Sequence, residues 1–223
     1  WGWRAVIPAL VRLGHTARAI DLPGHGADTT PPAKQTLQGC ARAVLAASTS
    51  DTILVGHSWG GYPIGMAAEI DPGAMRALVF LCAYVPANGQ SMVDRARGAA
   101  RQPLKGALAR GDDGLTYTFK PEAAREALYH DCPDEVVEFA MAHLGPQASF
   151  PQTEAAVLTD RFDRVPKSYI RCRDDRTIPP EYQAEMCRDW PEDTVHTLPT
   201  SHSPFLSNPA GLADVLSQIS GHL

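Results

Sequence analysis

The chain has 223 residues, of which 44% are apolar, and its formal net charge is −5. A chain of this length can bury one substantial core, and it fits one compact, enzyme-sized unit better than two independent ones. The charged residues form no long run of one sign and no apolar run reaches 18 residues, so the sequence predicts neither a nucleic-acid partner nor a membrane partner.

Strands and helices are predicted to alternate along the chain. The predicted strands, which are short apolar runs bounded by turn residues, are 15–20, 52–56, 76–85, 167–172 and 193–198. The predicted helices, with apolar residues at helical spacing, lie within 1–15 and at 36–47, 59–70, 180–189 and 209–220. This alternation predicts the α/β class, with a mostly parallel sheet flanked by helices and joined by right-handed crossovers.

One long segment interrupts this alternation between the strands predicted at 76–85 and 167–172. It carries helical patterns at 121–130 and 133–144, and a small hairpin is predicted around 114–120. Such a connection is too long for an ordinary loop and is typical of a functional lid. We predict a helical cap or lid inserted between late strands of the core, with the cap at 86–160 and the core at 1–85 and 161–223.

The stretch TILVGHSWGGYPIG, residues 52–65, places a serine between a predicted strand and a predicted helix. Gly56, Ser58 and Gly60 form the pattern G-x-S-x-G, in which the chain reverses so sharply that the serine takes a strained backbone conformation. The flanking glycines lack the Cβ atoms that would collide in such a turn. The turn presents the Ser58 hydroxyl above the sheet, and we expect the backbone N–H of Trp59 to serve as an oxyanion donor.

A serine acts as a nucleophile only with a base and a group that orients the base. Asp174 and Asp175 come just after one predicted strand, and His202 lies in a loop after the last one, in the chain order that this turn predicts. His202 would accept the Ser58 proton and pass it to the leaving group. An aspartate would hold the imidazole in one tautomer and stabilise its cation.

Several of these residues also have simpler interpretations. The nearby arginines at 171, 173 and 176 could hold either aspartate in a surface ion pair. His57, next to Ser58, could pack in the interior as well as face a substrate. His25 and Asp28, in the loop PGHGAD, are expected to stabilise their own turn.

The segments DLPGHG, GHSWGG, YIRCRDDRTIPPEYQ and SHSPFLSNP together resemble the α/β-hydrolase superfamily, in particular its small-capped branch of bacterial esterases, plant methylesterases and hydroxynitrile lyases. The resemblance extends over nearly the whole chain. It implies that Ser58 is the nucleophile, His202 the catalytic histidine and Asp175 the acid, because the family's acid stands three residues after the strand-end position held here by Cys172. Asp174 is the alternative acid.

The chain departs from this family pattern in two places. Family members carry a strand ending in His-Gly before a Trp-rich turn, and its loop supplies a second oxyanion N–H. The printed sequence begins at WGW, which resembles the end of that turn, so we expect that it is a piece of a longer chain and that this donor lies outside it. The lyases place a lysine after the catalytic histidine, whereas this chain has Ser203, which favours hydrolysis.

We therefore expect a serine hydrolase of the carboxylesterase type that cleaves a small, fairly apolar ester through an acyl-enzyme on Ser58. Two alternatives stay open, a lyase of the hydroxynitrile-lyase type and a non-hydrolytic ligand-binding member of the same fold. The sequence contains no nucleotide-binding glycine pattern and no clustered metal ligands, so we expect no cofactor and no metal. The expected partner is a small-molecule ester, and the sequence leaves the oligomeric state open.

The five cysteines are odd in number and show no C-x-x-C spacing. A disulfide framework or a zinc site is therefore not expected. We interpret the cysteines as reduced thiols and predict a cytoplasmic location.

Overall fold

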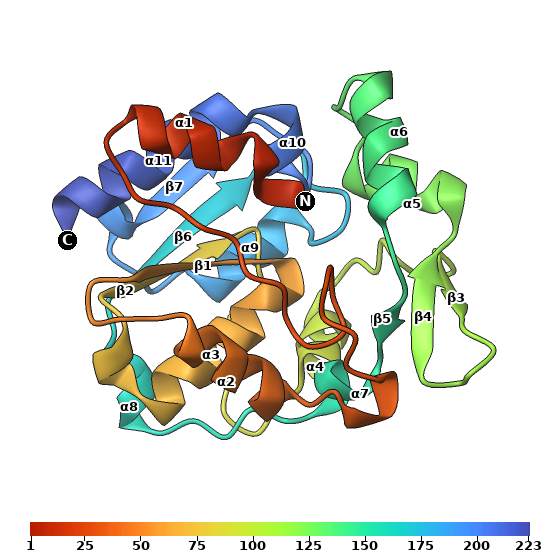
Figure 1. Ribbon diagram of the computed structural model, residues 1–223, viewed down its shortest axis with the longest axis horizontal. Helices are drawn as coiled ribbons and strands as arrows, with labels where there is room; N and C mark the ends of the chain where they lie inside the picture. The colour runs from red at the N-terminus through yellow and green to blue at the C-terminus, as the bar shows by residue number, and fades with distance from the viewer.

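The computed structural model describes every residue from 1 to 223. Its main sheet contains four parallel strands in the order β1–β2–β6–β7. These strands are β1 (Ile53–His57), β2 (Ala77–Leu81), β6 (Lys167–Cys172) and β7 (Val195–Leu198). Helices cover both faces of the sheet (Figure 1), so the predicted α/β class with a mostly parallel sheet is confirmed.

Strand β2 contributes side chains to two separate hydrophobic cores. Leu78 and Phe80 belong to the core on one face of the sheet, and Val79 and Leu81 belong to the core on the other face. All the residues of this strand are buried. Because successive side chains of a strand point to opposite faces, a strand between two helical layers has to be apolar throughout. This requirement explains the unbroken apolar run in the sequence.

The helices form one layer on each face of the main sheet (Figure 1). On one face α1 (Val6–Arg12) packs against α11 (Pro209–His222), which places the first and the last α-helix side by side. On the other face α3 (Gly61–Ile70) packs against α2 (Leu37–Ala46) and α8 (Asp160–Asp163). None of the helices combines the length and the apolar character that crossing a membrane requires.

The remaining helices of the core are short. Two α-helices follow strands β6 and β7, namely α9 (Pro180–Met186) and α10 (Pro204–Ser207). The 3-10 helices are η1 (Gly2–Arg4), η2 (Pro32–Lys34), η3 (Ser58–Gly60), η4 (Pro72–Ala74) and η5 (Glu192–Thr194).

Between β2 and β6 the chain forms a second group of elements beside the main sheet (Figure 1). Its small antiparallel sheet has the order β3–β4–β5, with β3 (Leu108–Arg110), β4 (Thr116–Phe119) and β5 (Gln147–Ala148). Its helices are α4 (Met92–Gly98), α5 (Pro121–Leu128), α6 (Asp134–His143) and α7 (Phe150–Thr153). The predicted hairpin and both predicted helices of this segment are confirmed. The assignment of 86–160 as a functional lid stays a prediction.

Contacts at two places tie this second group to the N-terminal part of the core. The guanidinium carbon of Arg4 lies 3.4 Å from the ring centroid of Phe139 on α6, and Trp1 meets the same ring edge-on. His25, in the loop before α2, forms a hydrogen bond through Nε2 to the Gln147 side-chain oxygen on β5 at 2.8 Å. The segment is therefore fastened to the N-terminal part of the core at both its helical and its sheet end.

Two sequence predictions need correction. Residues 15–20 form no strand and are mostly exposed, because they pair with no strand of the main sheet. The strand predicted at 76–85 ends at Leu81. The next residue, Cys82, has a φ of 32°, and this left-handed backbone conformation cannot continue a strand.

Candidate active site

The chain reverses at Ser58, directly after β1, in a strained backbone conformation. Ser58 has a φ of 54°, which is unusual for a residue other than glycine and costs about 1 to 2 kcal/mol. A Cβ atom on Gly56 would lie 2.5 Å from the Gly60 carbonyl oxygen, and one on Gly61 would lie 2.2 Å from the Tyr84 carbonyl oxygen. The predicted crowding is therefore confirmed at Gly56.

The prediction for Gly60 is wrong in its physical reason. A Cβ atom on Gly60 would meet nothing within 4 Å, and its φ of −54° suits any residue. The glycine that the tight turn requires on this side is Gly61, because α3 begins there against the end of β2. The Ser58 carbonyl also accepts a hydrogen bond from the Tyr84 N–H at 3.1 Å, which fixes the turn to the same segment.

His202 and Asp175 form a buried hydrogen-bonded pair. His202 Nδ1 lies 2.8 Å from Asp175 Oδ2, and the two residues are 1% and 3% exposed. The other carboxylate oxygen, Oδ1, accepts the backbone N–H groups of Thr177 at 2.6 Å and Ile178 at 2.9 Å. Both oxygens of the carboxylate are thus engaged by donors, as a buried acid requires.

Only one of the two candidate aspartates reaches this histidine. Asp174 is turned to the surface, where its carboxylate lies 3.6 Å from the Arg173 guanidinium. Arg176 pairs with Glu126 on α5. The ion-pair interpretation therefore applies to Asp174, whereas Asp175 has the geometry expected of the acid.

The partners of His202 determine its tautomer. Because an ionised carboxylate can only accept hydrogen bonds, Nδ1 carries the proton that Asp175 receives. Nε2 then has a free lone pair and no protein partner, which is the state that a general base needs. The structure has no hydrogen bond between this ring and the Ser58 hydroxyl, although both residues follow strand ends at the same edge of the parallel sheet. Such bonds are often long before substrate binds.

His57 supports the backbone of His202. Its Nε2 lies 2.7 Å from the His202 carbonyl oxygen, so it must carry the proton of this hydrogen bond. The centroid of the His57 ring is 4.5 Å from that of His202 and 4.9 Å from that of Phe205. Burial, and then the neighbouring His202, lower the pKa of His57 well below 6.5. Of the two interpretations of His57, the structure supports packing in the interior.

His57, Cys82 and His202 have ligand atoms within 4.8 Å of one another, a spacing that a metal ion could use. Each of the three side chains already has a hydrogen-bond partner, however, although His202 Nε2 has none. His57 Nε2 and Cys82 Sγ both lie at hydrogen-bond distance from the His202 carbonyl, and His202 binds Asp175. Burial also raises the pKa of the Cys82 thiol well above 9, which disfavours the thiolate that binds metals. The donor set therefore does not fit a metal site.

The loop PGHGAD stabilises itself, as predicted, and also reaches the surroundings of Ser58. Asp28 accepts the backbone N–H groups of Gly24 and Thr30, and these bonds lower its pKa to about 2. His25 Nδ1 lies 3.0 Å from the Pro23 carbonyl oxygen. The His25 ring stacks on the Trp59 ring with 6.3 Å between centroids. This loop therefore links the residue after Ser58 to β5 through the His25 contact with Gln147.

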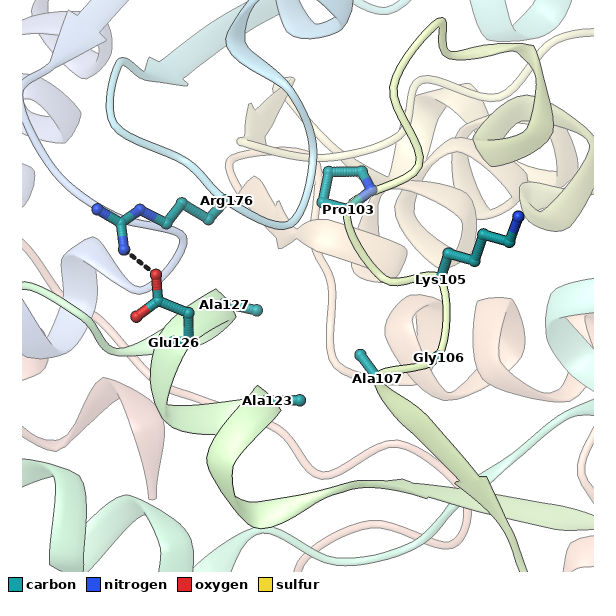
Figure 2. A pocket seen from close by; sticks show the side chains of 8 residues that line it. All are labelled: Pro103, Lys105, Gly106, Ala107, Ala123, Glu126, Ala127 and Arg176. Carbon is teal, nitrogen blue, oxygen red and sulfur yellow. Dashed lines mark hydrogen bonds and ion pairs between the residues drawn. The ribbon is translucent and has the colours of Figure 1, made fainter.

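A separate cavity of about 390 Å³ opens between α5 and the loop at Pro103–Ala107. Figure 2 shows Ala123 and Ala127 of α5 on one side, facing Ala107 on the other, with the pair of Arg176 and Glu126 at the rim. None of Ser58, Asp175 and His202 lines this cavity. It is therefore not where the candidate chemistry takes place.

Two groups that build the site have no role predicted from the sequence. Gln183 donates to Asp175 Oδ2 at 2.8 Å, and Cys82 Sγ lies 3.5 Å from the His202 carbonyl. Gln183 is the last residue of the segment YIRCRDDRTIPPEYQ that carries the family resemblance, and this is the signal that could have pointed to it. Cys82 stands in no motif.

A serine in a strained turn after a parallel strand, followed by an acid and a histidine from later strand ends, defines an α/β-hydrolase arrangement. Residues 1–215 match the alpha/beta hydrolase family. The chain belongs to this family, which confirms the resemblance and the fold inferred from the sequence.

The relatives agree with this assignment. The chain is 27% identical over 242 residues to Methylesterase 1 of Arabidopsis thaliana, covering 98% of this chain and 90% of that protein. It is 29% identical over 225 residues to a pyrethroid hydrolase of Sphingobium wenxiniae, covering 96% and 80%. The crystal structure of a pyrethroid hydrolase from Sphingobium faniae superposes with a TM-score of 0.84 at 26% identity, covering 99% and 92%. The predicted enzyme class, an α/β-hydrolase of the carboxylic ester hydrolase type, is confirmed.

The two glycines after Ser58 should respond differently to a methyl group. We expect Gly61→Ala to lower the free energy of unfolding by about 1 to 3 kcal/mol, because the new Cβ would collide with the Tyr84 backbone. Gly60→Ala, the matched control, has open space and a compatible φ and should leave it unchanged or raise it by about 0.4 to 1 kcal/mol. Urea unfolding measures both, and equal losses would contradict this account of the turn.

The lowered pKa of His57 predicts a pH dependence of stability. Below about pH 6.5 the unfolded chain binds a proton on His57 that the folded chain does not bind. The free energy of unfolding should therefore decrease as the pH is lowered. The slope approaches about 1.4 kcal/mol per pH unit for one full proton. His57→Gln keeps a donor but cannot titrate, and should therefore lose this dependence between pH 7 and 5.

The control for this measurement is His222→Gln, at the exposed C-terminal end of α11. Its stability curve should stay parallel to that of the wild type. Parallel curves for wild type and His57→Gln would instead mean that the folded protein accepts the proton on His57.

Proposed function

We propose that this protein is a serine carboxylesterase that cleaves a small, fairly apolar ester through an acyl-enzyme on Ser58. The observation that carries the proposal is the buried hydrogen bond between His202 Nδ1 and Asp175 Oδ2, which leaves His202 Nε2 free as a base. It is supported by the relatives whose names are methylesterase and pyrethroid hydrolase.

The proposed reaction has two halves. In the first, His202 Nε2 takes the Ser58 proton as the serine oxygen attacks the ester carbonyl, and the same proton then goes to the departing alcohol. In the second, His202 takes a proton from water, the water oxygen attacks the acyl group, and the acid leaves as Ser58 regains its proton. Asp175 stabilises the imidazolium in both halves without taking the proton.

The oxyanion of each tetrahedral intermediate would be held by the backbone N–H of Trp59. This group stands at the start of the helical run of η3 and α3, where unpaired N–H groups and the helix dipole favour negative charge. The family resemblance implies a second donor from a strand ahead of Trp1. Assays should therefore use a protein that includes any residues preceding Trp1 in the natural chain.

The location that we propose is cytoplasmic. The five cysteines are free thiols, four of them buried, and a reducing compartment keeps such thiols unmodified. Comparing the amount of free thiol in freshly isolated and fully reduced protein tests this point, because paired cysteines would differ between the two samples.

Replacing the nucleophile should abolish hydrolysis of a short-chain aryl ester. We expect Ser58→Ala to lower kcat by about 10⁴-fold or more, because no acyl-enzyme can form. The control, Ser207→Ala, removes a buried hydroxyl that has no hydrogen-bond partner and lies on α10, outside the proposed machinery. It should keep kcat within about 2-fold, as is usual away from reacting groups. Full activity in Ser58→Ala would contradict the proposal.

A further inference from the structure

The side chain of Gln183 lies against the Asp175–His202 pair and is completely buried. It comes from α9, the helix that follows the acid. Its Nε2 donates to Asp175 Oδ2 at 2.8 Å and to the Ile178 carbonyl oxygen at 2.8 Å. Asp175 Oδ2 is the same oxygen that accepts the proton of His202 Nδ1. One carboxylate oxygen is therefore shared between an amide and the imidazole.

The orientation of this amide is fixed by its other end. Gln183 Oε1 accepts the backbone N–H of Cys172, the last residue of β6, at 2.9 Å. A flipped amide would turn its oxygen toward the Ile178 carbonyl and the Asp175 carboxylate, and its NH₂ group toward the Cys172 N–H. Both encounters are repulsive. The Cys172 N–H at the end of β6 therefore determines that the NH₂ group of Gln183, and not its oxygen, faces Asp175.

We infer that Gln183 is a positioning residue that holds the Asp175 carboxylate in place and sets how strongly it attracts the proton of His202. The inference rests on the proposed serine mechanism. A hydrogen bond donated to a carboxylate oxygen withdraws part of its negative charge, and the imidazolium on the other side is then less strongly stabilised. Gln183 would therefore keep His202 neutral, and active as a base, down to a lower pH.

The other groups around His202 do not involve Gln183. His57 from β1 contacts the His202 backbone carbonyl through Nε2 and also packs against the His202 ring, with 4.5 Å between the centroids. Cys82 after β2 contacts the same carbonyl. Asp131 accepts the backbone N–H of Ser201 at 2.7 Å. Removing the Gln183 donor leaves all of these contacts in place, so its effect on the ring passes through Asp175.

The test is Gln183→Met, which keeps the length of the side chain and removes both the donor to Asp175 and the acceptor of the Cys172 N–H. We expect the acid limb of the kcat/KM profile to move to higher pH by about half a unit to one unit, with a fall in kcat of about 10-fold. The ring titration of His202, followed by NMR, should move in the same direction. The control is Gln152→Met, because Gln152 is also buried but accepts from Tyr117 on β4 and does not contact Asp175. It should move neither titration.

An acid limb and a His202 titration that both stay in place in Gln183→Met would overturn the inference, because a purely structural glutamine alters only stability. If the variant does not fold, the wild type gives the answer by NMR. The Gln183 side-chain amide signals should shift with the same midpoint as the His202 ring, while those of Gln152 stay still. Gln183 signals that do not respond would also overturn the inference.

The NMR measurement distinguishes the proposed function from the role of Gln183. A protein that hydrolyses no ester but shows the coupled shift of Gln183 and His202 would contradict the proposed function and support the role of Gln183. An active esterase without that coupling would support the proposed function and contradict the role of Gln183.

Discussion

A buried carboxylate must recover from protein donors the hydrogen bonds that it gives up in leaving water. In this chain the donors to Asp175 are the backbone N–H groups of Thr177 and Ile178, the Gln183 amide and His202. The first three stand on the segment from the end of β6 into α9, so the main sheet sets the position of the acid. His202 adopts one tautomer and one orientation because the acid is already fixed. The chemistry proposed for Ser58 depends on this arrangement.

The second anchor of the site is the backbone carbonyl of His202. His57 and Cys82, which stand at the ends of neighbouring strands, both contact this one oxygen. Together with Asp175 at the end of β6, they bring three strand ends of the parallel sheet to the loop that follows β7. The Cys82 conformation, with a φ of 32°, occurs at this junction, where β2 has to stop so that its last residues can close around the site. Strain is thus concentrated at Ser58 and Cys82, which directly follow β1 and β2.

The sequence predicted features whose cause is local. The turn at Ser58 follows from glycine spacing between an apolar strand and a helix, and the apolar run of β2 follows from burial on two faces. The residues alone left Asp174 and Asp175 open, and only the family resemblance favoured Asp175, because the choice depends on which carboxylate turns inward. The role of Gln183 depends on how α9 packs against the end of β6, and no residue pattern encodes that.

The errors have the same origin. The segment 15–20 has strand-like residues, but a strand forms only when it pairs with another strand. Residues 15–20 pair with no strand of either sheet. The sequence predicted that Gly60 must be a glycine, whereas the structure requires glycine at Gly61. The group that a Cβ atom would hit is the Tyr84 carbonyl, which is distant in the sequence. Local patterns therefore predicted the individual turns and strands better than the long-range contacts that support them.

The central claim is that Ser58 carries the acyl group during turnover. The direct measurement is rapid acid quenching of the reaction with an activated aryl ester, followed by mass mapping of the digested protein. The account predicts an acyl adduct on the peptide containing Ser58, formed in an initial burst and absent in Ser58→Ala. Steady turnover with no adduct on that peptide, or an adduct at another residue, would contradict it.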